Sequence, residues 1–167
     1  QNIKNYLMRY HQYEEQHILC LLDDGSTPHR PTRQNMIQAL KQLVKQSMPG
    51  DAVYFHFSGH GGLIVDSSLN FDFFSSSGSS QPKDHQTTTK KGFDETLYPV
   101  DHTTAGQIRD FNLFHHFVQP MRAGVIVTCV MDCCHSGSVL DLPYSYKPTT
   151  SSSSSRGGIQ AEQSMNQ

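Results

Sequence analysis

The chain has 167 residues, 35% of them hydrophobic, and its formal net charge at pH 7 is −2. This length and hydrophobic content suit one domain with a modest core, and the small charge without a Lys/Arg-rich run argues against a nucleic-acid partner. No segment approaches the roughly 18 consecutive apolar residues of a membrane span, and the polar N-terminus is unlike a signal peptide. We therefore expect a protein that binds neither nucleic acid nor membrane and resides in the cytoplasm.

The first part of the chain predicts a helix followed by a strand. Apolar side chains recur at the i, i+3, i+4 and i+7 positions of residues 3–10, which is the spacing of one helix face. The run 18–22 is apolar throughout, is too short for a buried helix and stops at an Asp-Asp-Gly turn. It therefore predicts a strand buried on both faces, as in a parallel sheet.

Two further helices and two further strands follow along the chain. Thr32 suits the N-cap of a helix whose apolar stripe runs through residues 36–44. Residues 52–57 are typical of a strand. Spaced apolar residues over 111–118 indicate the next helix, and residues 125–131 indicate the next strand.

Strands that alternate with helices predict right-handed crossovers and a parallel sheet covered on both faces. In such sheets, functional sites lie beyond the carboxyl ends of the strands. The glycine-flanked His60 follows one predicted strand, and Cys134 follows another within residues 132–137. If these two strands are neighbours, His60 and Cys134 meet at one edge of the sheet.

His60 and Cys134 supply the groups of an activated thiol nucleophile. A thiol attacks an amide as the thiolate, and a neighbouring imidazole stabilises that thiolate and protonates the leaving amine. Glycines beside His60 let a substrate approach the backbone closely, and the backbone amides of Gly61 and Cys134 are candidates for an oxyanion hole. The alternatives are a structural histidine and an inert, buried cysteine.

Zinc binding is the other chemistry that these residue types invite. Its candidate ligands are Cys129, Cys133, Cys134, His135 and His60. The sequence has no two matching C-x-x-C pairs, and strand alternation points Cys129 toward the core. The four cysteines, two of them vicinal, instead favour free thiols in a reducing compartment.

Two segments have compositions that cannot bury enough apolar area to offset their ordering entropy. We expect a Ser/Thr-rich surface insertion at about 66–91 and a disordered Ser-rich tail at 149–167. Residues 1–148 would then form the domain.

Four stretches of the sequence resemble the type I metacaspases, which are caspase-like cysteine peptidases of the C14 group. These stretches are residues 31–37, 55–62, 92–101 and 132–144. The resemblance implies an α/β, caspase-like three-layer sandwich with a mainly parallel central sheet flanked by helices, here incomplete and limited to the large catalytic (p20-like) region. It also implies an endopeptidase of programmed cell death that cleaves proteins or peptides after Arg or Lys through a His60/Cys134 dyad and a thioester. The cysteine signature of true caspases is absent.

The resemblance further implies positions that bind substrate and calcium. Asp132 matches the acidic residue of a pocket in which a carboxylate pairs with guanidinium or ammonium, and Ser58 matches another pocket position. Three positions of a calcium-binding carboxylate cluster are matched by Asp94, Asp110 and Asp141. The fourth position is Phe111, which cannot ligate and weakens the expected activation by Ca²⁺. Solvated surface aspartates are the competing interpretation.

Parts of the family's fold are missing from this sequence. The family's first strand and a pocket-building Gly-Cys-x-Asn-Asp segment would precede Gln1, and the small subunit that completes the sheet is not present. Missing strands would expose sheet edges. The alternative function is therefore a truncated, non-catalytic interaction or regulatory module, whose partner is a small-subunit region or a full-length relative supplied in trans.

Overall fold

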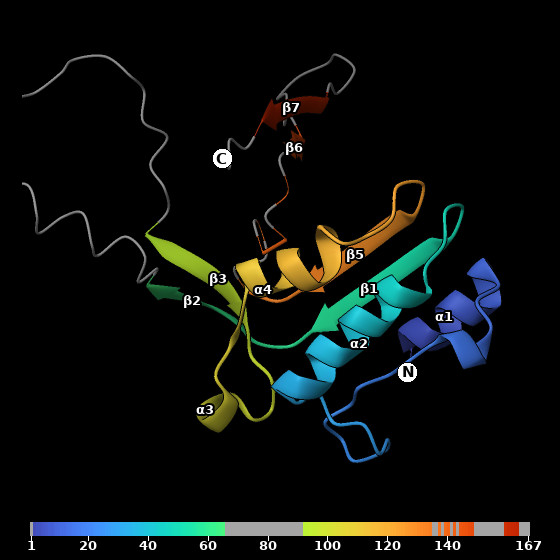
Figure 1. The fold of residues 1–167 in the computed structure, drawn as a ribbon, viewed down its shortest axis with the longest axis horizontal. Coiled ribbons are helices and arrows are strands. Elements are labelled where there is room, and N and C mark those ends of the chain that lie inside the picture. The colour runs from blue at the N-terminus through green and yellow to red at the C-terminus, as the bar shows by residue number, and fades with distance from the viewer. Residues whose placement is uncertain are drawn as a thin grey trace, which may run out of the picture.

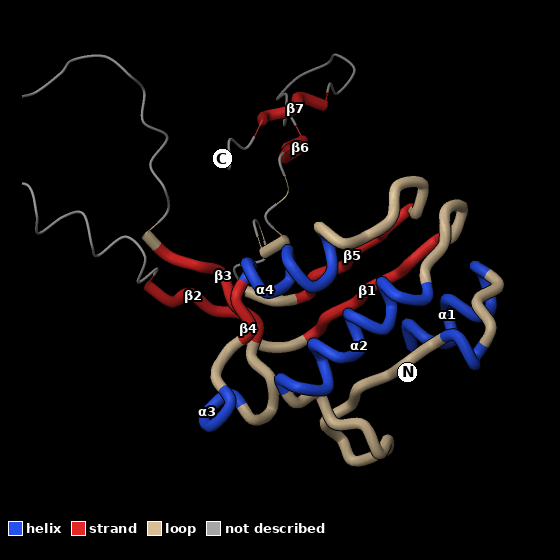
Figure 2. Tube along the Cα trace, viewed as in Figure 1, coloured by secondary structure: helices blue, strands red, loops and turns tan. Residues whose placement is uncertain are grey.

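The computed structural model describes residues 2–65, 92–134, 137, 139–140, 142, 144–148 and 159–163. In chain order the elements are α1 (Asn2–His11), η1 (Glu15–His17), α2 (Arg33–Gln46), β1 (Ala52–Ser58), β2 (Gly61–Val65), β3 (Phe93–Leu97), α3 (His102–Ala105), β4 (Ile108–Arg109), α4 (Asp110–Leu113), the π-helical turn η3 (Phe114–Val118), β5 (Ile126–Asp132), β6 (Tyr144–Pro148) and β7 (Ile159–Gln163). Figures 1 and 2 show their arrangement.

Strands β1 and β5 form a parallel pair, which confirms the predicted neighbours. Their register runs from Ala52 opposite Ile126 to Ser58 opposite Asp132. Helix α2 and the continuous helix of α4 and η3 lie side by side on one face of this pair (Figure 1). The rings of Phe55 in β1 and Phe117 in η3 lie 5.5 Å apart between centroids. This face therefore holds the core.

Helix α2 forms as its sequence predicts. The side chain of Thr32 accepts a hydrogen bond from the backbone N–H of Asn35 at 3.2 Å, which satisfies one of the free donors at the helix start. Met36 and Leu40 are buried against the strands. Helix α1 is also confirmed, although only Leu7 is buried in it.

The predicted strand at residues 18–22 is wrong. This segment pairs with no described strand, and Leu19 is 54% exposed. Its backbone hydrogen bonds within the described residues include two local ones, from the Leu22 N–H to the His29 carbonyl and from the Ile18 N–H to the Glu15 carbonyl. Apolar composition makes a strand only where a neighbouring strand supplies hydrogen-bond partners. Here the segment does not pair with β1, and both line a groove of about 1840 Å³ instead.

The opposite face of the parallel pair carries exposed apolar side chains. Ile126 is 68% exposed and Val130 is 39% exposed, although both lie in β5. The structure is therefore α/β with a parallel pair, an additional antiparallel sheet and flanking helices, which agrees with an incomplete caspase-like fold.

An antiparallel sheet in the order β2-β3-β4 follows the carboxyl end of β1 (Figure 2). This sheet was not predicted from the sequence. Strand β2 begins at Gly61, directly after His60, and Leu97 of β3 and Ile108 of β4 are fully buried. This second sheet fixes the direction in which the chain leaves the histidine.

The two segments of low apolar content differ in what the structure describes. The insertion at 66–91 lies outside the described residues. Within the expected disordered tail, Ile159–Gln163 forms β7 and pairs antiparallel with β6. The rest of 149–167 is not described. In the part of the chain that is described, no helix is long and apolar enough to cross a bilayer.

Candidate active site

The carboxyl ends of β1 and β5 hold the two predicted substrate-binding residues side by side. Ser58 and Asp132 are opposite each other in the parallel register. The Ser58 hydroxyl donates to Asp132 Oδ2 at 3.3 Å, and the backbone N–H of Gly59 donates to the Asp132 carbonyl at 3.3 Å. Both side chains are exposed, so the carboxylate is accessible to a basic group from solvent.

The loops that carry His60 and Cys134 touch each other at Gly61. A Cβ built on Gly61 would lie 2.0 Å from the Cys134 carbonyl oxygen and 3.1 Å from the carbonyl carbon. Such distances are far inside van der Waals contact, so only glycine fits there. Gly61 was predicted from the sequence to be an amide donor. In the structure, its lack of a side chain also lets the two loops come together.

Tyr98 holds the His60 loop from the other side. Its backbone N–H donates to the His60 carbonyl at 3.0 Å, and its ring lies 2.6 Å from a Cβ built on Gly62. The His60 side chain itself is exposed. The role of Tyr98 could not be predicted from the sequence, where it is only one residue of the motif 92–101, because a backbone contact does not depend on residue type.

The adjacent thiols Cys133 and Cys134 differ in environment. Burial, followed by the nearby Cys134, Asp132 and Glu95, raises the pKa of the Cys133 thiol, which keeps it protonated. Its Sγ lies 3.3 Å from a Cβ built on Gly61. Cys134 is exposed. Of the vicinal pair, Cys134 is therefore the thiol that a substrate can reach.

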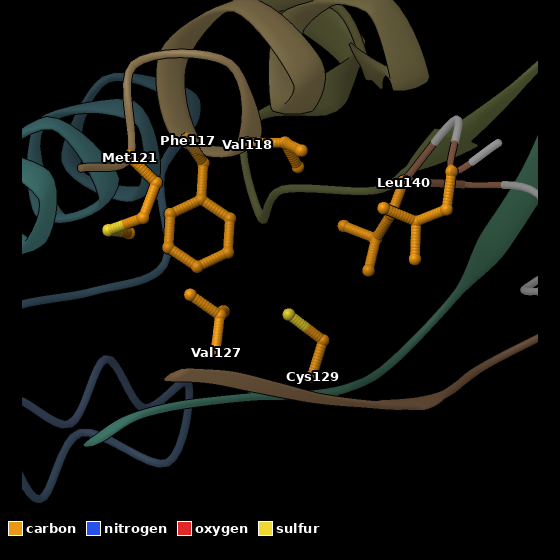
Figure 3. Close-up of a pocket in the computed structure, with 7 residues that line it drawn as sticks. Phe117, Val118, Met121, Val127, Cys129 and Leu140 are labelled. Carbon is orange, nitrogen blue, oxygen red and sulfur yellow. The ribbon is translucent and has the colours of Figure 1, made fainter. Parts of the chain in front are cut away.

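Cys129 lies in an apolar cavity of about 210 Å³ between η3 and β5 (Figure 3). The cavity is lined by Phe117, Val118, Met121, Val127, Leu140 and Leu142 together with Cys129. Burial raises the pKa of the Cys129 thiol to about 11. A neutral thiol among apolar side chains is a poor metal ligand, which argues against the zinc interpretation for this residue.

Two of the three carboxylates matched to a calcium cluster, Asp94 and Asp110, are hydrogen-bonded to protein groups. Asp94 Oδ2 accepts from the Arg109 guanidinium at 3.1 Å. Both oxygens of Asp110 accept backbone N–H groups, from Glu95 at 3.3 Å and from Phe111 at 2.6 Å. Asp141 lies outside the described residues. Among the residues that are described, no three His, Cys, Asp or Glu side chains gather as a metal site.

Two parallel strand ends thus bring a histidine loop, an accessible cysteine and a carboxylate together in an α/β domain. An α/β fold with this arrangement agrees with an incomplete caspase-like domain. The family described as "Metacaspase, peptidase C14 domain" matches residues 1–72 and 67–143. The chain therefore belongs to the metacaspase family of C14 peptidases.

Several curated metacaspases are similar to this chain. Metacaspase III c of Phaeodactylum tricornutum is 41% identical over 146 residues, covering 87% of this chain and 38% of that protein. Metacaspase-1 of Pyricularia oryzae is 38% identical and Metacaspase-1 of Kluyveromyces lactis 39%, each over 87% of this chain and over 32% and 30% of those proteins respectively. The chain thus spans about a third of the length of these curated relatives. A crystal structure of a Geobacter sulfurreducens protein aligns at 30% identity over 66% of this chain and 33% of that chain, with a TM-score of 0.45.

Proposed function

We propose that this chain is a cysteine-type endopeptidase that hydrolyses peptide bonds after Arg or Lys, with Cys134 as nucleophile and His60 as its acid and base. The observation that carries the proposal is the contact of Gly61 with the Cys134 backbone, which joins the two loops at one end of the parallel pair. The family assignment supports cysteine peptidase chemistry.

The proposed reaction proceeds through a thioester. The Cys134 thiolate attacks the carbonyl carbon of the scissile bond, and backbone N–H groups of Gly61 and Cys134 donate to the oxyanion that forms. The His60 imidazolium gives its proton to the leaving amine as the C–N bond breaks. His60 then takes a proton from water, whose oxygen attacks the thioester and releases the acid product and the thiol.

The preference for basic residues rests on Asp132. Its carboxylate is exposed beside the nucleophile loop, and the Ser58 hydroxyl donates to it without adding charge. A guanidinium or ammonium on the substrate would form a charge-assisted hydrogen bond there. Asp132→Asn should therefore reduce kcat/KM for Arg and Lys peptides more than for peptides with a neutral residue at that position.

Hydrolysis of fluorogenic Arg and Lys peptides tests the proposal. Cys134→Ala should abolish turnover. Cys20→Ala is the matched control, because it removes a thiol that is remote from these loops in sequence, and it should not change turnover. Turnover that survives Cys134→Ala would refute the assigned dyad.

A second candidate function is that of a non-catalytic interaction module that pairs with a small-subunit region or a full-length relative. It is favoured by the open edge of β1, which pairs with β5 and with no other described strand. The Asp51 carbonyl accepts the Ile126 N–H and the Gly59 N–H donates to the Asp132 carbonyl, so odd-numbered residues of β1 bond β5. The backbone groups of Tyr54 and His56 then point to the other edge, toward the groove.

The open edge has the features of a strand-pairing surface. The Ala52 carbonyl accepts the Tyr13 hydroxyl at 2.9 Å, which occupies only the amino end of the edge. Beyond it, an added strand could bond to the backbone of Tyr54, His56 and Ser58 without displacing β5. Proline at position 56 would remove one donor from this edge and leave the β5 ladder intact.

Labelling and light scattering separate the two functions. Rapid modification of Cys134 by an electrophilic Arg-peptide probe would count against an inert module. A stable complex with a full-length relative that is weakened by His56→Pro, together with no labelling, would count against the peptidase.

A further inference from the structure

We propose that Arg109 is the permanent cation of the acidic corner between β3 and α4, so that this chain does not use the calcium switch implied by its resemblance to metacaspases. The acidic corner is defined here as Asp94 and Asp110. The proposal concerns cation binding and stability, and it does not depend on the chemistry of Cys134.

The sheet register places the Arg109 guanidinium beside the Asp94 carboxylate. In the antiparallel pair of β3 and β4, Arg109 is opposite Thr96, and Asp94 is two residues along on the same face. Such diagonal pairs are within reach of long side chains. Arg109 Nη1 donates to Asp94 Oδ2 at 3.1 Å, and the Asp94 side chain is only 19% exposed. The ion pair is therefore fixed by backbone register and is partly shielded from solvent.

Asp110 is also engaged by groups other than a metal. Its Oδ2 accepts the backbone N–H of Glu95, and its Oδ1 accepts that of Phe111. The bond from Glu95 ties the start of α4 to β3, and the bond from Phe111 lies within α4. The carboxylate thus has a structural role at this corner that needs no ion.

The position at which the resemblance expects a fourth ligand, Phe111, offers no oxygen ligand. The Phe111 ring is 60% exposed and lies 4.2 Å from the His115 ring between centroids. Calcium requires six to eight oxygen ligands, and a guanidinium bonded to one of the few carboxylates repels a divalent cation. The described residues of this corner therefore do not fit calcium, whereas Arg109 already supplies a positive charge to Asp94.

Calcium titration by calorimetry and thermal unfolding of the 167-residue chain, with and without Cys134→Ala, test this proposal. We expect no saturable calcium binding and the same midpoint in calcium and in magnesium. Arg109→Gln should lower the midpoint by about 2–4 °C whether calcium is present or not, and Arg109→Lys should lower it less because it keeps the charge. Arg30→Gln is the matched control, since the Arg30–Asp23 pair is 61% and 63% exposed and should contribute little.

Saturable calcium binding by the wild-type chain would overturn the proposal, and so would an unchanged midpoint in Arg109→Gln. The double variant Arg109→Gln/Phe111→Asp provides the converse test. Terbium luminescence or calcium-dependent stabilisation that appears only in the double variant would support the assignment. If neither signal appears in the double variant, the claim that Arg109 and Phe111 exclude calcium is refuted. None of these measurements requires peptide hydrolysis, so a failure here is distinguishable from a failure of the peptidase proposal.

Discussion

Replacing Gly61 by alanine should separate the two loops of the candidate site. The added Cβ would lie 2.0 Å from the Cys134 carbonyl oxygen. The closest favourable C···O contacts in proteins are about 3.3 Å. One loop must therefore move by about 3.3 − 2.0 = 1.3 Å, and the obstacle is backbone, which cannot rotate away as a side chain can.

The cost of this movement can be estimated in stability and in rate. Overpacking of this kind typically costs about 1–3 kcal/mol. At about 2–4 °C per kcal/mol for a chain of this size, the midpoint of thermal unfolding should fall by roughly 2–12 °C. A displacement of about 1 Å between reacting groups costs on the order of 100-fold in rate. Turnover of Arg peptides should therefore fall by about 100-fold, at a temperature well below the lowered unfolding midpoint.

Circular dichroism gives the midpoint, and fluorogenic peptide hydrolysis gives the rate. The matched controls are Gly92→Ala and Gly137→Ala, since a Cβ at either position meets no atom within 4 Å. If Gly61→Ala unfolds at the same temperature as these controls and retains their turnover, the contact between Gly61 and Cys134 does not hold the two loops together, and the reasoning is refuted.

Three further predictions concern the core, a helix start and a buried thiol. Phe117→Ala removes a fully buried ring and should destabilise the chain by about 3–5 kcal/mol in urea unfolding, and a loss below about 1 kcal/mol would contradict its central place in the core. Thr32→Ala removes the cap of α2 and should cost about 1 kcal/mol, measured as a lower unfolding midpoint, whereas Thr103→Ala on the exposed surface should not. Burial raises the pKa of Cys129 to about 11 from its usual 9.0, so the unfolded chain releases this proton first and stability falls as the pH rises from about 9 to 11. Cys129→Ala should flatten that decline, and a decline of equal steepness in the variant would argue that the thiol is not shielded. Alkylation at pH 7.5 followed by mass spectrometry should modify Cys134 well before Cys129.

The sequence predicted the parts of the fold that follow from local pattern. The Thr32 cap and apolar stripe define α2, and segments rich in β-branched and aromatic or other apolar residues define β1 and β5. Because those segments end at motifs rich in small residues, parallel pairing was enough to predict that the loops of His60 and Cys134 meet. The contact at Gly61 agrees with this prediction.

The rest of the structure depends on partners that are distant in sequence. Residues 18–22 have the composition of a strand, but no described neighbour bonds to them. Strand β2 begins with two glycines, which read as a loop, and it forms because β3 pairs with it across the undescribed residues 66–91. The ion pair of Asp94 with Arg109 follows from the register of β3 and β4, which residue types alone do not reveal.

The ladder of β2 and β3 also separates the histidine loop from the segment 66–91. Its first pair, Gly61 opposite Leu97, lies beside the histidine, and its last pair, Val65 opposite Phe93, lies where the long insertion begins and ends. Four steps along a strand span about 14 Å. A change in the length of segment 66–91 therefore acts on the far end of a paired ribbon, about 14 Å along the strand from Gly61 and the contact between the two loops.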